Sequence, residues 1–345
     1  MAETIKLSID AMSGDHGLKT TVNAAFSALL ADPRLHLVLV GDQVAVEAAL
    51  SAHPTFDRAR LVTHHASQVV TMDESPSKAL RNKKDSSLRV AIDLVKEGRV
   101  QAAVSAGNTG ALMATARFVL KTLPGIDRPA ICAPMPALKG RPYMLDLGAN
   151  SECSPEQLLQ FAVMGAALAT AMQGIARPRV ALLNIGEEEI KGSDTIKAAA
   201  QLLLASGLNY TGYVEGDGIF RGEADVVVAD GFVGNVALKS AEGAAKMIRD
   251  FMKAEFTRNA LTKAAALIAK PVLNRLAARI DPRHYNGASL LGLNGLVIKS
   301  HGGADALSFA NAIAVAAHAV ENDISGRIRH LLEIAQPQPP AVAEG

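Results

Sequence analysis

The stretch that decides the fold of this chain reads Ser105-Ala106-Gly107-Asn108-Thr109-Gly110. It follows a short apolar run at residues 102–104 and precedes a helical pattern that opens at Ala111. A strand that breaks into small residues and restarts as a helix directs backbone N–H groups, reinforced by the helix dipole, at one point. Such a point suits phosphate, but a tight turn that needs glycine only for its backbone gives the same pattern. The stretch therefore predicts a strand, a turn and a helix, with an anion site and a purely structural turn as alternatives.

Short apolar runs alternate with helical patterns along almost the whole chain. The runs that are typical of strands span residues 5–9, 35–40, 60–63, 101–104, 131–135, 143–147, 180–185, 210–214, 224–229 and 295–299. Ser154, Pro155 and Gln157 give the N-cap, the first-position proline and the capping-box partner of a helix that reaches Met172. This βαβ succession predicts a mostly parallel sheet in a single α/β domain over residues 1–335.

Composition bounds the class of protein. Of the 345 residues, 49% are hydrophobic and only 4% aromatic, which is typical of a parallel sheet covered by alanine-rich helices. The net charge of +1 favours no nucleic-acid partner. Cys132 and Cys153 lack metal-ligand spacing, so we expect neither zinc nor a disulfide framework. With no signal-peptide pattern or membrane-length apolar run, we expect a cytoplasmic protein that can still lie against a membrane, with a disordered tail at residues 336–345.

Six of the predicted strands are followed by loops of Gly, Asn, Ser, Asp or His. These loops span residues 10–17, 105–110, 146–150, 184–186, 230–235 and 300–305. Because ligands of a doubly wound sheet gather at the carboxyl ends of its strands, we expect the loops to converge on one edge as an anion-binding cleft. None of them has GxGxxG or Walker spacing, so dinucleotide and nucleoside triphosphate sites lose their usual support.

Several polar side chains in these loops are candidates for chemistry. The asparagines in them are either turn residues or neutral donors to an oxyanion: Asn108, Asn150, Asn184 and Asn235. Lys191 either belongs to a solvated charge cluster or reaches a substrate oxygen. His16 and His301 are either acid–base groups or hydrogen-bonded turn residues. Cys153 precedes a helix N-terminus, which lowers a thiol pKa, but no matching His and Asn spacing supports a covalent acyl-enzyme.

Residues 251–281 form a basic amphipathic segment. We expect Pro271 to divide it into two helices of a protruding hairpin. Its basic residues are interleaved with apolar ones that include Leu261, Leu267, Ile268, Val272 and Leu276. Such a hairpin serves as an interfacial membrane contact, as a dock for an acidic protein, or as a packing pair in a dimer or core. The pattern alone leaves these alternatives open.

Taken together, the motifs resemble those of the fatty acyl phosphate synthases, the PlsX-type phosphate acyltransferases of bacterial phospholipid synthesis. The resemblance runs from residue 9 to about residue 329. It rests on residues 9–12 with 14–16, 75–87, 105–113, 146–150, 184–188 with 191–192, 231–239 and 292–301. Two positions depart from the family pattern, since Ser13 replaces a glycine and Leu18 a proline, which affects the first loop and not the assignment.

The resemblance implies a reaction in which an acyl group moves from the thioester of acyl carrier protein to inorganic phosphate. It implies a Rossmann-like α/β/α sandwich related to isocitrate and isopropylmalate dehydrogenases and to phosphotransacetylases. It also implies a homodimer, peripheral contact with the anionic cytoplasmic membrane through the hairpin, and a downstream glycerol-3-phosphate acyltransferase. Phosphate can attack a thioester directly, so no metal, cofactor or covalent acyl-enzyme is expected.

The resemblance assigns a catalytic pair, Lys191 and Asn235. The glycine loops are then expected to bind phosphate or acyl phosphate through Gly14, Asp15, His16, Ser105, Gly107, Asn108, Thr109, Asn150, His301 and Gly302. Two other functions remain as alternatives at this point. A dehydrogenase on the same fold needs a nicotinamide site and usually a carboxylate-bound metal, whereas a non-enzymatic membrane scaffold needs only the hairpin.

Overall fold

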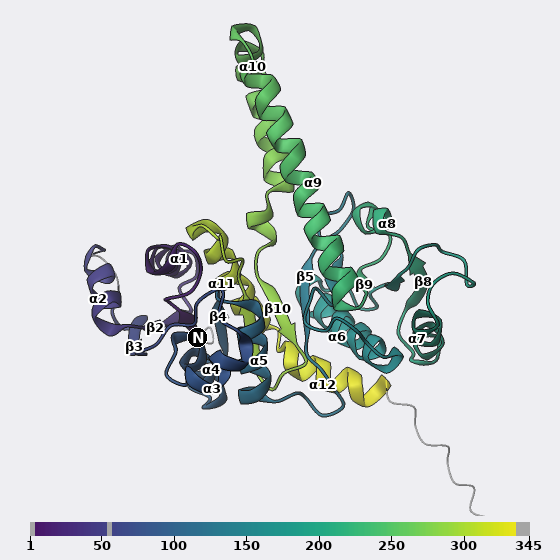
Figure 1. The fold of residues 1–345 in the computed structure, drawn as a ribbon, viewed down its shortest axis with the longest axis horizontal. Coiled ribbons are helices and arrows are strands. Elements are labelled where there is room, and N and C mark those ends of the chain that lie inside the picture. The colour runs from purple at the N-terminus through teal and green to yellow at the C-terminus, as the bar shows by residue number, and fades with distance from the viewer. Residues whose placement is uncertain (1–3, 54–56, 336–345) are drawn as a thin grey trace, which may run out of the picture.

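The computed structural model describes residues 4–53 and 57–335, and within them the strands form one eleven-stranded sheet (Figure 1). Its order is β3-β2-β1-β4-β11-β10-β5-β6-β9-β7-β8. The strands are β1 (Ile5–Asp10), β2 (Leu35–Gly41), β3 (Leu61–His65), β4 (Ala102–Ser105), β5 (Ala130–Pro134), β6 (Tyr143–Leu145), β7 (Val180–Leu183), β8 (Tyr210–Val214), β9 (Val226–Val228), β10 (Ala288–Leu291) and β11 (Leu296–Lys299). The predicted tail at residues 336–345 lies outside the described residues.

Strand direction divides the sheet into two parallel groups. The first group, β1 to β4 with β11, pairs in parallel throughout. β10 is antiparallel to both β11 and β5, and β5 is antiparallel to β6. β6, β9, β7 and β8 are again parallel to one another. These three reversals make the second group run opposite to the first. The prediction of a mostly parallel sheet is confirmed, but the reversing strand β10 was missed because its four residues show no alternation of apolar and polar side chains.

Helices cover both faces of the sheet. One hydrophobic core joins the sheet to α1, α2, α6, α7, α11 and α12, and the other joins it to α3, α4, α5, α8 and α9. Their bounds are α1 (Gly17–Ala31), α2 (Gln43–Ser51), α3 (Pro76–Asn82), α4 (Ser87–Lys96), α5 (Thr109–Leu120), α6 (Pro155–Gln173), α7 (Asp194–Ala205), α8 (Gly216–Arg221), α9 (Gly231–Thr257), α10 (Ala260–Ile280), α11 (Ala306–Glu321) and α12 (Ile324–Ala335), with a 3₁₀ turn η1 (Pro282–Tyr285). The chain is therefore an α/β/α sandwich.

Side-chain alternation along the strands assigns each residue to one of the two cores. In β4, Val104 enters the core beneath α1 and α11, whereas Ala103 enters the core beneath α4 and α5. Helix α6 starts with the predicted capping box, in which the Ser154 hydroxyl accepts from Gln157 N at 3.3 Å. It buries Phe161 completely, which contributes about 1.5–3 kcal/mol to folding.

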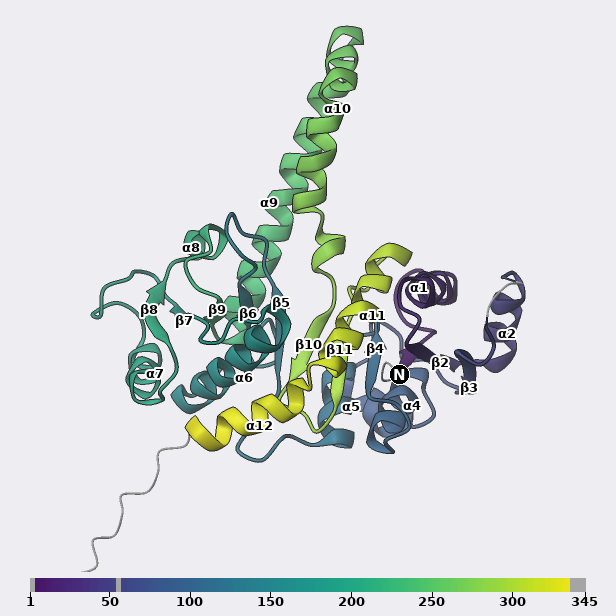
Figure 2. The ribbon, with the colours of Figure 1, turned by 180° about the vertical axis from the view of Figure 1, so that it is seen from behind.

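Helices α9 and α10 form a hairpin that projects away from the rest of the protein in both views (Figures 1 and 2). The prediction that Pro271 divides the two helices is wrong, because Pro271 lies inside α10. The chain turns instead at Arg258 and Asn259. There the Asn259 side chain accepts from Thr262 N at 2.9 Å and caps the new helix. Capping at Asn259 thus sets the turn, and α10 tolerates one missing backbone donor at its proline.

Candidate active site

The first loop cluster consists of the loops that follow β1, β4 and β11, at residues 10–17, 105–108 and 300–303. The Ser105 hydroxyl donates to Asp10 Oδ2 at 2.6 Å, and Asp15 N donates to Gly302 O at 2.8 Å. Ser13 Oγ accepts from the backbone N–H of residue 106 at 2.9 Å. Neighbouring parallel strands end side by side, so these bonds hold their loops together at one edge of the sheet.

Some side chains of this cluster that were predicted to bind phosphate already form hydrogen bonds with other groups of the protein. Asn108 Oδ1 caps α5 by accepting from Ala111 N at 2.9 Å, and Asn108 Nδ2 donates to the carbonyls of Met72 and Glu74. The Ser105 hydroxyl accepts from Gly107 N at 3.0 Å and is buried. The structure therefore favours a positioning role for the side chains of Ser105 and Asn108 over the direct phosphate contact predicted from the sequence.

Other predicted ligands of the first loop cluster remain accessible. The side chains of Asp15, His16, Thr109 and His301 are exposed. His301 Nδ1 accepts from the N–H of residue 303 at 3.1 Å, which leaves Nε2 directed elsewhere. Gly14 has a φ of +83°, and a Cβ there would lie 3.0 Å from Gly302 O. Glycine at that position lets the first and last loops approach each other closely.

Two buried ionisable groups that the sequence analysis did not single out lie beneath these loops. Asp10 is fully buried, and burial raises the pKa of its carboxyl. Lys299 is 9% exposed, and burial together with the charge of Lys239 lowers the pKa of its ammonium to about 8. The sequence did contain a signal for Lys299, because this charged residue directly follows three apolar residues of a predicted strand. Charged residues are seldom buried.

The second loop cluster consists of the loops that follow β6 and β9, at residues 146–150 and 230–235. Asp146 organises it, because its buried carboxylate accepts from Ile131 N at 2.9 Å, from Asn150 N at 2.7 Å and from Asn150 Nδ2 at 2.9 Å. Asn150 Nδ2 also donates to Pro129 O at 2.9 Å. Both Asn150 amide hydrogens are thus used inside the protein, which again favours positioning over the predicted phosphate contact.

Glycines let the start of α9 dock on this cluster. A Cβ at Gly231 would lie 2.6 Å from Asn150 O, and one at Gly234 only 1.8 Å from Asp146 O. No larger residue fits such a close approach of helix to loop. The docking places Asn235, the fifth residue of α9, on an exposed side of the helix and against Gly148. The amide of Asn235 is therefore presented to solvent by a rigid support.

Lys191 lies in the loop between β7 and α7. Asn184 Nδ2 donates to Gly186 O at 3.1 Å, and Gly192 adopts a φ of +89° where the loop turns back towards Asn184. The Lys191 side chain packs along Gly186 and is exposed. Among the described residues, no carboxylate forms an ion pair with Lys191, so its ammonium is available to a substrate oxygen.

The expectation that all six loops converge on one edge is wrong. The second group of strands runs opposite to the first. The carboxyl ends of the two groups, and with them the two loop clusters, therefore lie on opposite sides of the sheet along the strand direction. Helix α9 connects them. It starts in the second loop cluster, packs on the core through Ala237 and Leu238, and brings Lys239 within electrostatic reach of Lys299. The sequence missed this arrangement because the reversals depend on β10.

Neither cysteine lies in an environment that lowers its thiol pKa, as a cysteine nucleophile requires. Burial and the charge of Asp146 raise the pKa of the Cys153 thiol to about 11. The prediction that the helix N-terminus lowers this pKa is therefore wrong, because desolvation outweighs the dipole. Cys132 is buried in the core as predicted, and burial raises its thiol pKa as well. Both thiols stay protonated near neutral pH.

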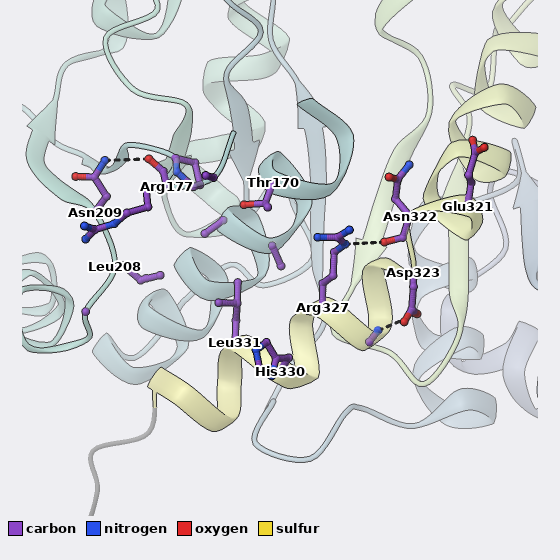
Figure 3. A pocket seen from close by; sticks show the side chains of 16 residues that line it. Thr170, Arg177, Leu208, Asn209, Glu321, Asn322, Asp323, Arg327, His330 and Leu331 are labelled. Carbon is purple, nitrogen blue, oxygen red and sulfur yellow. Dashed lines mark hydrogen bonds between the residues drawn. The ribbon is translucent and has the colours of Figure 1, made fainter. Parts of the chain in front are cut away.

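A pocket of about 610 Å³ lies elsewhere, between α6 and α12 (Figure 3). Its labelled polar residues include Thr170, Arg177 and Arg327, and it contains none of the predicted site residues. Its carboxylates are engaged within the protein, since Glu321 pairs with Arg34 at 2.6 Å and Asp323 accepts from the N–H of residue 326. The candidate chemistry therefore belongs to the loops at the strand ends and not to this pocket.

Within residues 4–53 and 57–335, no group of three or more His, Cys, Asp or Glu side chains is arranged to hold a metal ion. None of the helices described there has the length and apolar character needed to cross a membrane.

Comparison with known proteins identifies the family. A sequence model described as fatty acid synthesis protein matches residues 5–327. A protein of Alkalilimnicola ehrlichii named phosphate acyltransferase is 60% identical over 333 residues, which cover 96% of this chain and 97% of that protein. One of Methylococcus capsulatus with the same name is 60% identical over 322 residues, covering 93% and 95% of the two chains.

Solved structures share the fold at low sequence identity. A phosphotransacetylase from Streptococcus pyogenes superposes with a TM-score of 0.64 at 18% identity, covering 93% of this chain and 95% of that one. The EutD phosphotransacetylase from Staphylococcus aureus gives 0.60 at 18% identity, covering 92% and 94%. The predicted relation of the fold to phosphotransacetylases is thereby confirmed. The family match over nearly the whole chain shows more, and this chain belongs to the family of fatty acid synthesis proteins, a family of acyl-transferring enzymes.

Proposed function

We propose that this enzyme transfers a fatty acyl group from the thioester of acyl carrier protein to inorganic phosphate. The products are an acyl phosphate and free carrier protein. The observation that carries the proposal is the 60% identity, over 96% of the chain, to a protein named phosphate acyltransferase. Acyl phosphate is a reactive mixed anhydride, so it suits immediate use by a glycerol-3-phosphate acyltransferase in the synthesis of phosphatidic acid.

The chemistry requires one bond to form and one to break. A phosphate oxygen attacks the thioester carbonyl carbon and gives a tetrahedral oxyanion, which collapses by breaking the carbon–sulfur bond. The proton of the attacking hydrogen phosphate ends on the carrier thiolate, so atoms and charge balance. The enzyme has to hold phosphate close to the carbonyl and stabilise the oxyanion, two effects that account for large rate enhancements.

Lys191 and Asn235 supply the catalytic groups of this proposal. Lys191 offsets negative charge on phosphate or oxyanion, and its exposed ammonium has the required freedom. Asn235, the fifth residue of α9, donates a neutral hydrogen bond close to the N-terminal end of the helix, where the helix dipole favours negative charge. Phosphate is bound by the accessible groups of the first loop cluster, which include Gly14, Asp15, His16, Thr109, His301 and Gly302. Both cysteines are protonated near neutral pH, which supports attack by phosphate and not by a protein thiol.

The hairpin of α9 and α10 provides the peripheral contact with an anionic membrane. Leu267 and Ile268 are 72% and 85% exposed, and Leu261, Val272 and Leu276 are also exposed along α10. Exposed apolar residues of this size normally mark a contact surface. The neighbouring basic residues Lys263 and Lys270 suit anionic lipid. The proposal also includes a homodimer, and burial of these residues between the hairpins of two subunits would assign them to that dimer and not to the membrane.

Release of the carrier thiol tests the reaction class. The enzyme is incubated with a purified acyl carrier protein thioester, and free thiol is followed with and without phosphate. The proposal predicts thiol release that depends on phosphate and saturates with it. Release that is independent of phosphate would indicate a thioesterase, and no release would reject the proposal.

A further inference from the structure

We infer that Lys239 and Lys299 together form an anion site that holds the inorganic phosphate of the reaction. The inference rests on the proposed function and gives it two residues that none of the predicted loop ligands include. Lys299 is the last residue of β11, in the first group of strands. Lys239 lies in α9, which follows β9 of the second group. An anion between these lysines would therefore join the two halves of the sheet.

The ammonium of Lys299 lacks a direct counter-ion. Its Nζ donates to the carbonyl of Ser300, and among the described residues no carboxylate lies within ion-pairing distance of it. Lys239 is exposed, and the one carboxylate that pairs with it among residues 4–53 and 57–335 is Glu242 on its own helix, at 2.7 Å. A nearly buried cation without a paired carboxylate is costly for a folded protein, and the cost falls when an anion binds.

The charged groups that face Lys299 come from three elements. Lys239 on α9 disfavours the charged form of Lys299, whereas Asp10 on β1 and Asp15 in the following loop favour it. Burial and Lys239 together outweigh the carboxylates, so the pKa of Lys299 falls to about 8. Two like charges brought together at the end of a strand provide the attraction that a dianion needs.

Asp10 gives a second, independent sign of a ligand. Its Oδ2 accepts from Ser105, whereas Oδ1 is buried and accepts no hydrogen bond of good geometry in the described part of the protein, although Ser87 and the Met12 N–H lie close enough to the carboxyl to lower its pKa. Buried carboxylate oxygens are normally paired. Hydrogen phosphate carries both negative oxygens for the two lysines and an O–H that can donate to a carboxylate. Its chemistry therefore matches the site better than that of a singly charged phosphodiester without such a donor.

Calorimetric titration with inorganic phosphate, without carrier protein, tests the assignment. We expect Lys299→Met and Lys239→Met each to weaken phosphate binding about 10- to 100-fold, as expected for loss of one charge-assisted hydrogen bond. Lys246→Met is the matched control, since Lys246 is an exposed lysine further along the same helix and should bind phosphate like the wild type. If Lys299→Met does not fold, the phosphate affinity of Lys239→Met decides whether the inference holds, because Lys239 is exposed and its substitution should not affect folding. Wild-type phosphate affinity in both variants would overturn the inference.

The phosphodiester of the carrier's phosphopantetheine arm is the other source of the same chemistry. Steady-state kinetics distinguish the two, because the inference predicts that both substitutions raise the KM for phosphate and leave the KM for the carrier thioester unchanged. The opposite split would overturn the inference. A protein that binds phosphate through these lysines but transfers no acyl group would refute the proposed function and leave the anion site standing.

The effect of Lys299 protonation on anion binding can be measured with sulfate in place of phosphate. Sulfate keeps both negative charges at neutral and alkaline pH, so a change of its affinity with pH reports on the protein and not on the anion. Because a neutral amine holds an anion poorly, sulfate binding should weaken by up to about tenfold per pH unit above pH 8. Lys299→Arg stays charged and should flatten this dependence. A steep pH dependence that survives in Lys299→Arg would contradict the role of Lys299.

Discussion

The two loop clusters use the same residue types but leave different groups available. In the first, hydrogen bonds between loops hold the scaffold, while the side chains of Asp15, His16 and His301 stay exposed. In the second, Asn150 donates to Asp146 through its backbone and its side chain, and Asn235 near the start of α9 has an exposed amide with no hydrogen-bond partner in the described part of the chain. The comparison teaches that the first cluster is suited to bind an anion and the second to place one donor accurately.

The largest expected effect concerns the groups that face solvent near the second loop cluster and the neighbouring β7 loop. Lys191→Ala and Asn235→Ala should each lower kcat by about 100- to 1000-fold, because each removes a donor to developing charge. Stopped assays of acyl phosphate formation measure this loss. Lys96→Ala, at an exposed lysine of α4 remote from both clusters, is the control and should match the wild type. Wild-type turnover in both catalytic variants would end the assignment.

The buried ammonium of Lys299, next to the first loop cluster, should make the folded protein less stable than it would be with an apolar side chain there. The pKa of Lys299 is depressed in the folded protein, from 10.5 to about 8, so folding favours its neutral form. Wild-type stability should therefore rise, relative to Lys299→Met, as the pH increases from about 8 to 10.5. At pH 7 the variant should be the more stable protein, by on the order of 3 kcal/mol.

Urea unfolding of both proteins at several pH values measures this difference. A stability difference between wild type and Lys299→Met that stays constant from pH 7 to pH 10.5 would show that Lys299 keeps an ordinary pKa in the folded protein. The cost of the buried ammonium would then be absent, and with it one reason to regard the first loop cluster as a site for an anion.

A third prediction tests whether the second loop cluster owes its accuracy to close packing. Gly234→Ala should destabilise the protein by about 1–3 kcal/mol and lower activity, because the new Cβ overlaps Asp146 O. Gly243→Ala is the matched control in the same helix. A Cβ at that position meets nothing within 4 Å, so the substitution should stabilise by about 0.5–1 kcal/mol. Equal effects of the two substitutions on unfolding and turnover would break the argument for a rigid support.

The smallest expected effect on catalysis belongs to α10, the half of the hairpin that carries no residue of either loop cluster. Ile268→Glu should abolish binding to anionic lipid vesicles and leave turnover of soluble substrate nearly unchanged. Ala265→Glu introduces the same charge at an exposed alanine and should retain most of the binding. Vesicle co-sedimentation and the elution volume of each protein are measured together. Loss of the dimer in Ile268→Glu, with lipid binding intact, would assign the residue to packing between subunits.

The local structure was predictable where short-range chemistry determines it. The strand before Ser105, the helix after it and the capping box at Ser154 are confirmed, because each depends on neighbouring residues alone. The distribution of the loops over two edges was not predictable, since β10 reverses the sheet through long-range pairing. The remaining differences between prediction and structure concern the pKa values of two side chains, and burial causes both. It raised the Cys153 pKa and lowered that of Lys299, effects that a sequence does not display.

The central claim, that inorganic phosphate attacks the carrier thioester, is tested most directly by trapping the product. Enzyme, acyl carrier protein thioester and phosphate are incubated, and hydroxylamine then converts any acyl phosphate to the acyl hydroxamate. The account predicts hydroxamate in an amount equal to the carrier thiol released, with none formed when phosphate is omitted. Thiol release without hydroxamate, or hydroxamate formed without phosphate, would contradict it.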